Sequence, residues 1–207
     1  MFDSMGSILE ALSPEQQIAC STQNNILLTA CPGSGKTRTL THRLAYQVLR
    51  DPASKKIKIA ITYTNRAAEE ITNRLEGMNI DQSSIWAGTS HQFCVQLIIL
   101  PYAMYSKRLC KGYRIIDDYS KKAYGREIAE RLGMHLNYYD DPFQYENVRT
   151  EYKRVLKEKK EIDFDAILLI SEELLASCAF IGSNIASVIS SILVDEFQDT
   201  NELQYSI

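Results

Sequence analysis

The chain has 207 residues, of which 45% are hydrophobic and 24% charged, and its formal net charge at pH 7 is −3. Such a chain buries a substantial core, and its composition excludes a disordered tail, a collagen-like fibre and a low-complexity linker. The first twenty residues lack the basic start and apolar run of a secretory signal, so we expect a cytoplasmic protein without a membrane span. Five scattered cysteines with no Cys-x-x-Cys pair argue against a disulfide framework and a zinc site.

Short apolar runs alternate with helical stretches along the chain, as in α/β proteins that have a parallel sheet flanked by helices. Strands are expected at residues 25–29, 58–62, 85–89 and 192–194, and helices at 36–50 and 66–76. The last apolar run ends in two carboxylates, which is typical of a central strand. We therefore predict an α/β domain whose functional residues gather at the carboxyl ends of its strands.

A basic, tyrosine-rich segment interrupts this alternation. Residues 101–162 hold fourteen Lys and Arg against ten Asp and Glu, and they contain nine of the twelve tyrosines. Basic residues interleaved with aromatics grip phosphates and stack on bases, but the same residues also form solvated helix faces and cover cores. We interpret residues 97–163 as a mostly helical insertion that divides the α/β domain into residues 1–96 and 164–207. The sequence leaves open whether this insertion contacts DNA.

The run Ala30-Cys-Pro-Gly-Ser-Gly-Lys-Thr37 follows an expected strand and opens an expected helix, which is the context of a phosphate-binding loop. Gly33 and Gly35 let the backbone turn its N–H groups toward phosphate oxygens, at the positive end of the helix. The Lys36 ammonium would reach the β- and γ-phosphates. The strict pattern begins with Gly, and Ala30 suits that position if its φ stays negative. The predicted nucleotide-binding residues of the loop are Ala30, Cys31, Pro32, Gly33, Ser34, Gly35, Lys36 and Thr37.

A second motif, Val194-Asp-Glu-Phe-Gln-Asp-Thr200, follows the last apolar run. Asp195 is placed to hold Mg²⁺ through water, and Glu196 to polarise the attacking water as a general base. The two carboxylates would also suit a helix cap, but a cap requires neither an apolar strand before it nor a phosphate loop elsewhere. We predict ATP and Mg²⁺ as cofactors, with Thr37 and Asp195 as the metal ligands.

Together these motifs resemble the amino-terminal part of the UvrD/Rep/PcrA-type superfamily 1 DNA helicases over essentially the whole chain. Leu12-Ser-Pro-Glu-Gln16 is similar to the family's Q motif, which implies that Gln16 reads the adenine edge and that Arg38 lies against the base. Residues 194–201 match the family's DExQD motif almost letter for letter. The implied catalytic residues are Lys36, Asp195, Glu196 and Gln198. The resemblance implies a RecA-like motor domain of an ATP-dependent 3′–5′ helicase that acts on single-stranded DNA.

Two further segments resemble family motifs that touch single-stranded DNA, Ile61–Ala68 and Gly88–His91. The implied DNA-binding residues are Tyr63, Thr64, Asn65, Thr89 and His91. Tyr63 keeps a stacking ring where the family usually has Phe, whereas Ser90 stands where an aromatic is usual. The alternatives are that Tyr63 caps a core and that His91 is an ordinary surface or core histidine.

The family motifs of a second motor domain, with its arginine fingers, do not occur before Ile207. The resemblance therefore implies a second motor domain in the full-length chain, and very slow ATP hydrolysis by these 207 residues alone. One alternative is a stand-alone P-loop phosphotransferase, against which Gln16, Tyr63 and the DExQD string argue. Another alternative is a non-catalytic DNA- or protein-binding remnant of a helicase.

Overall fold

The computed structural model describes residues 2–31, 33–137 and 139–207. The strands are β1 (Ile57–Thr62), β2 (Ile85–Thr89), β3 (Arg114–Ile115), β4 (Glu161–Ile162) and β5 (Ile189–Val194). The helices are α1 (Phe2–Glu10), α2 (Pro14–Ser21), α3 (Lys36–Arg50), α4 (Asn65–Gly77), α5 (Ser90–Phe93), α6 (Leu100–Tyr102), α7 (Asp118–Arg131), α8 (Glu146–Lys159), α9 (Phe164–Ser177), α10 (Ala179–Val188) and α11 (Glu202–Ser206). Short π- or 3₁₀-helical segments are η1 (Cys94–Ile99), η2 (Ala103–Tyr105), η3 (Pro142–Gln144) and η4 (Phe197–Asp199).

The chain forms two compact units. The first extends to Phe93 and resumes over Gly182–Asn201, and the second comprises Cys94–Ile181 and Glu202–Ile207. The expected insertion, residues 97–163, lies within the second unit. That unit also contains α9, because α9 packs against the π-helical segment η1.

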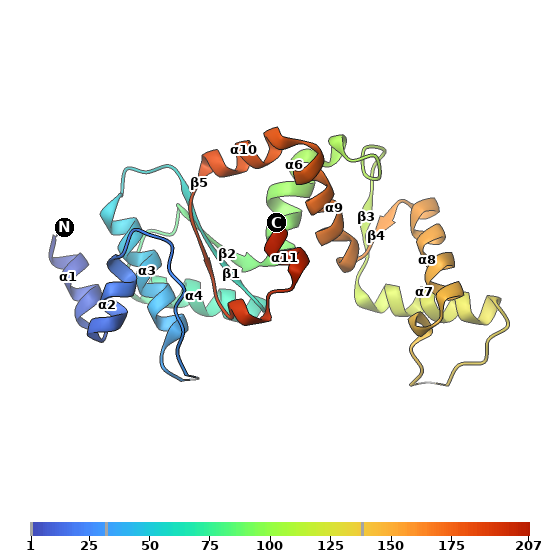
Figure 1. The fold of residues 1–207 in the computed structure, drawn as a ribbon, viewed down its shortest axis with the longest axis horizontal. Coiled ribbons are helices and arrows are strands. Elements are labelled where there is room, and N and C mark those ends of the chain that lie inside the picture. The colour runs from blue at the N-terminus through green and yellow to red at the C-terminus, as the bar shows by residue number, and fades with distance from the viewer. Residues whose placement is uncertain (1, 32, 138) are drawn as a thin grey trace. The chain divides into compact units, whose positions relative to one another are not determined.

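The first unit contains a parallel sheet with the strand order β2-β1-β5 (Figure 1). Thr62 pairs in register with Thr89, and Ile61 pairs with Val194, so the three strands end at the same edge. The expected strands at 58–62, 85–89 and 192–194 are confirmed, although β1 and β5 begin earlier, at Ile57 and Ile189. The α/β fold class is therefore confirmed. The segments that follow β1, β2 and β5 leave the sheet side by side at the same edge.

The expected strand at residues 25–29 is wrong. These residues form no strand, and the side chains of Ile26, Leu27 and Leu28 are 43%, 72% and 38% exposed. A run of apolar residues favours a strand, but only a neighbouring strand can pair with its backbone. β1 is already paired on both sides, with β2 and β5, and the 25–29 segment pairs with neither of these two strands.

Two helices cover the sheet of the first unit and form its core. Side chains of α3 and α4 pack in one cluster with Ala60 of β1 and Leu193 of β5. The helix residues of this cluster recur at helical spacing; they are Leu44, Ala45, Val48, Ile71 and Leu75. The helix expected at 36–50 is confirmed, and α4 extends the helix expected at 66–76 by one residue at each end.

The second unit is mostly helical and has a core of its own. Helices α7 and α8 enclose a cluster made of Ile116, Ile128, Ala129, Val148, Tyr152 and Leu156. The Tyr152 hydroxyl donates to Asp163 Oδ2 at 3.0 Å, which joins α8 to the residue that caps α9. None of the helices in the described ranges combines the length and apolar character needed to cross a membrane.

Candidate nucleotide site and nucleic-acid interface

The predicted phosphate loop leads directly into α3, which begins at Lys36. Gly33 has a φ of +77° and Gly35 a φ of +88°, values that glycine adopts without a steric penalty. Gly35 stands at the N-cap, and no side chain of the described residues caps this end. The first N–H groups of α3 are therefore available to an anion, with the helix dipole behind them. The prediction for Pro32 lies outside the described residues.

The two halves of the predicted metal site meet. The Thr37 hydroxyl donates to Asp195 Oδ2 at 2.9 Å, although the two residues lie 158 positions apart in the sequence. The sheet positions the carboxylate, because the Asp195 N–H donates to the Ile61 carbonyl of β1 at 2.8 Å. The described residues contain no group of three or more His, Cys, Asp or Glu that would hold a metal by itself. A hydroxyl and one carboxylate nevertheless fit Mg²⁺, which proteins usually bind through one or two carboxylates together with substrate phosphates.

The predicted catalytic side chains lie around this pair. The Lys36 ammonium donates to the Ala30 carbonyl at 3.2 Å, which holds it across the loop. Glu196 is exposed and has a φ of +52°, a left-handed conformation that is uncommon for a non-glycine residue and occurs often at active sites. The Gln198 side-chain amide donates to the Glu196 carboxylate and orients it.

The predicted adenine-side residues lie beside the loop and make contacts within the chain. Gln16 Oε1 accepts from the Ser13 N–H at 3.1 Å, and its Nε2 donates to the Ser34 carbonyl at 3.1 Å. This amide therefore links the start of α2 to the phosphate loop. The Arg38 guanidinium donates to the Ala11 carbonyl at 2.7 Å. Contact of Gln16 or Arg38 with adenine stays a prediction.

The predicted DNA-binding residues follow two neighbouring strands. Tyr63 follows β1 and is 70% exposed, which removes the alternative that it caps a core. The Thr64 hydroxyl accepts from the Ala67 N–H at 3.1 Å and so caps α4, whose first residue is Asn65. Thr89 ends β2, and its hydroxyl accepts from the Gln92 N–H at 3.3 Å, while His91 lies in α5. Because β1 and β2 end in register, these segments lie side by side, and their contact with DNA stays a prediction.

The cysteines of the two cores are not candidates for nucleophilic chemistry. Burial raises the pKa of both Cys20 and Cys94 to about 11, so both thiols stay protonated at neutral pH. The Cys20 thiol donates to the Thr39 carbonyl of α3 at 3.4 Å. Cys20 therefore joins α2 to α3 as a packing residue.

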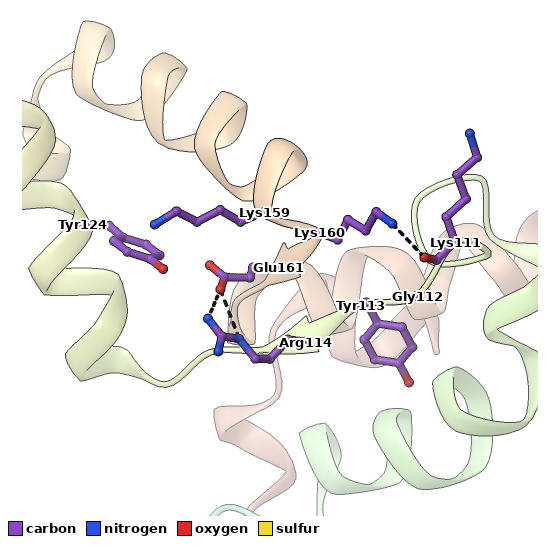
Figure 2. Close-up of a pocket in the computed structure, with 8 residues that line it drawn as sticks. All are labelled: Lys111, Gly112, Tyr113, Arg114, Tyr124, Lys159, Lys160 and Glu161. Carbon is purple, nitrogen blue, oxygen red and sulfur yellow. Dashed lines mark hydrogen bonds and ion pairs between the residues drawn. The ribbon is translucent and has the colours of Figure 1, made fainter.

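Sequence reasoning missed a pocket in the second unit, where β3 and β4 pair (Figure 2). The pairing places Arg114 beside Glu161, 47 positions away in the sequence. Each strand has two residues, too few for any hydrophobic alternation to show. The available signal was the basic, tyrosine-rich composition of the segment.

Comparison with known proteins gives a consistent family. The UvrD/REP helicase N-terminal domain matches residues 12–144 and 134–207. The ATP-dependent DNA helicase PcrA of Leuconostoc citreum is 29% identical over 90% of this chain and 29% of its own length. DNA helicase II of Escherichia coli K12 is 26% identical over 96% of this chain and 31% of its own length, and PcrA of Staphylococcus aureus Mu50 is 26% identical over 98% and 32%. The chain thus spans less than a third of the length of these relatives.

Proposed function

Because the chain belongs to the UvrD/REP helicase N-terminal domain family, we propose that it is the ATP-binding portion of an ATP-dependent DNA helicase. The observation that carries this proposal is the hydrogen bond between Thr37 and Asp195. It joins the loop suited to phosphates with the carboxylate suited to Mg²⁺, which is the pairing that phosphoryl transfer from ATP requires.

In the proposed mechanism the loop and the start of α3 bind the phosphates through backbone N–H groups, and Lys36 neutralises the terminal phosphate oxygens. Thr37 and Asp195 would hold Mg²⁺, which supplies neutralisation of the charge that develops on the phosphate oxygens. Glu196 orients a water molecule for attack and accepts its proton, and Gln198 keeps the Glu196 carboxylate in position. Gln16 and Arg38 bind the base after exchanging their present partners.

The strand-end segments would carry single-stranded DNA, with a base stacked on the exposed Tyr63 ring and the backbone along Thr64, Asn65, Thr89 and His91. The α/β core would form the first RecA-like motor domain, and residues 97–163 its insertion. We propose a second motor domain in the full-length chain, consistent with the length of the relatives. We also propose 3′–5′ polarity, which is what the resemblance of the motifs to the family implies. Closure of two motor domains on ATP would step the protein along the strand.

Titration of fluorescent ATP, with Mg²⁺ and with EDTA, tests the nucleotide site. Lys36→Ala should weaken binding under both conditions, because a charge-assisted contact with phosphate is worth about 1.5 to 3 kcal/mol. Thr37→Ala and Asp195→Asn should abolish the enhancement by Mg²⁺ while leaving binding in EDTA close to that of the parent. Asp51→Asn, at the opposite end of α3, is the charge-matched control.

The double variant of Thr37 and Asp195 should lose little more of the Mg²⁺ enhancement than either single variant, since both residues serve one ion. Unchanged affinity in Lys36→Ala, or an undiminished Mg²⁺ effect in Asp195→Asn, would refute the assignment. Phosphate transfer to a small acceptor with no response to single-stranded DNA would favour the phosphotransferase alternative.

A further inference from the structure

The pocket between β3 and β4 holds a buried carboxylate oxygen that lacks a partner. The Glu161 side chain is 2% exposed, and its Oε1 accepts from Arg114. Glu161 Oε2 is buried and has no hydrogen-bond partner among the described residues. In Figure 2 this free oxygen lies on the side of Tyr124 and Lys159. A buried acceptor of this kind calls for a donor, which a ligand in the pocket would supply.

The remainder of the pocket is basic and aromatic. Its volume is about 510 Å³, within the range of small-molecule sites. Lys111, Lys159 and Lys160 line it together with Tyr113 and Tyr124. With Arg114 included, the lining contains four cationic residues and the single carboxylate of Glu161, so the pocket favours a ligand that carries negative charge as well as a donor.

Contacts within the pocket hold two of these lysines, Lys160 and Lys159. Lys160 follows the last residue of α8 and has a φ of +55°. Its ammonium donates to the Lys111 carbonyl at 3.2 Å, which ties together the segments before β3 and β4. The Lys159 ammonium lies 4.0 Å from the centre of the Tyr124 ring. Lys159 thus covers an aromatic face and approaches the free Glu161 oxygen from the same side.

We propose that this pocket binds one unpaired nucleotide of a DNA strand. The base donates an exocyclic amino hydrogen to Glu161 Oε2 and lies against a tyrosine ring, and its phosphate lies among the lysine ammonium groups. Cytosine, adenine and guanine carry such an amino group. Thymine carries no exocyclic amino group, and its N3–H lies between two carbonyl oxygens. The Glu161 carboxylate would repel these oxygens, so the pocket disfavours thymine.

This inference rests on DNA being the ligand of the proposed function, but it uses neither the phosphate loop nor the strand-end segments. The test is fluorescence anisotropy with labelled (dT)12 and with the same oligonucleotide carrying one central dC. Tyr63→Ala serves as the background, so that stacking at the strand ends does not mask the pocket. The dC oligonucleotide should bind about threefold to tenfold more tightly, as expected for one hydrogen bond that discriminates between bases.

Variants of the pocket should separate its two contributions. Glu161→Gln presents a donor as well as an acceptor, so the preference for dC should disappear. Lys159→Ala should weaken both oligonucleotides about threefold to tenfold and reduce the salt dependence. Lys153→Ala, also exposed on α8 but outside the pocket, is the matched control and should bind like the background protein.

A crosslink provides a test that does not depend on the folding of any variant. Irradiation of the parent chain with an oligonucleotide containing 5-iododeoxycytidine should give adducts on Tyr113 or Tyr124, located by mass spectrometry. Equal affinity for the two oligonucleotides, or crosslinks that all lie outside the pocket, would overturn the proposal. Competition by free dCMP at the same concentration as the oligonucleotide would overturn the assignment to a DNA strand.

Lys36→Ala should leave these results unchanged, so failure of the ATP site and failure of the pocket are distinguishable.

Discussion

Replacing Gly35 by Ala tests whether the phosphate loop needs its left-handed backbone. Gly35 has a φ of +88°, which costs a residue with a Cβ about 1 to 2 kcal/mol. The added Cβ would also lie 3.2 Å from Gln16 Nε2, so that side chain must shift by a few tenths of an ångström. The shift would disturb the hydrogen bond from Gln16 to the Ser34 carbonyl.

The energetic cost of Gly35→Ala should appear either in the free energy of unfolding or in the affinity for Mg·ATP. If the loop keeps its conformation, the free energy of unfolding falls by about 1 to 2 kcal/mol. If the loop relaxes to a negative φ, its N–H groups turn away from the phosphates, and Mg·ATP affinity falls by up to about 5-fold to 30-fold. The two losses should together account for the strain.

Both quantities are measured on the same samples, by urea denaturation followed with circular dichroism and by titration with fluorescent ATP. Gly33 has a φ of +77°, and a Cβ added there would have open space around it. Gly33→Ala should therefore show the backbone strain without the contact with Gln16. Gly77→Ala, at the end of α4, has open space and no positive φ, and should be neutral or stabilising by up to about 1 kcal/mol. If Gly35→Ala matches Gly77→Ala in both assays, the loop does not need its left-handed backbone at Gly35.

Three further predictions concern ATP turnover, DNA binding and the pH dependence of stability. The 207-residue chain should hydrolyse ATP near background even with single-stranded DNA, because an arginine finger commonly supplies about 10³ to 10⁵ in rate; turnover of several per second that Glu196→Gln abolishes would contradict this. Tyr63→Ala should weaken binding of single-stranded DNA by about 1 to 3 kcal/mol in anisotropy, whereas an unchanged affinity would remove the stacking role. Burial lowers the pKa of His42, which hydrogen-bonds the Arg38 carbonyl at 2.8 Å, so the unfolded chain binds the proton more readily. The contribution of neutral His42 to the free energy of unfolding should therefore be complete above about pH 6.5 and decrease as the pH falls below it. Urea denaturation at pH 7.5 and 5.5 should show a smaller decrease in the free energy of unfolding for His42→Gln than for the parent.

Features that depend on neighbours in the chain were predictable. The helix predicted after the glycine-rich loop has the bounds of α3, and the strand predicted at residues 85–89 has the bounds of β2. The phosphate loop was predicted from its spacing, and Gly33 and Gly35 have the left-handed conformations that such a loop uses. Its role in nucleotide binding stays a prediction. The same local reasoning failed for residues 25–29, because an apolar run does not specify a pairing partner.

The sequence by itself determined the loop, the carboxylates after the last strand and the family to which they point, because each is a short pattern whose chemistry is local. Only the tertiary structure decided that Thr37 bonds to Asp195, since that contact needs β5 beside β1 in a particular register. Likewise, only the pairing of β3 with β4 buries Glu161 with one oxygen unsatisfied. Contacts between residues far apart in the chain depend on packing and register, which no local pattern encodes.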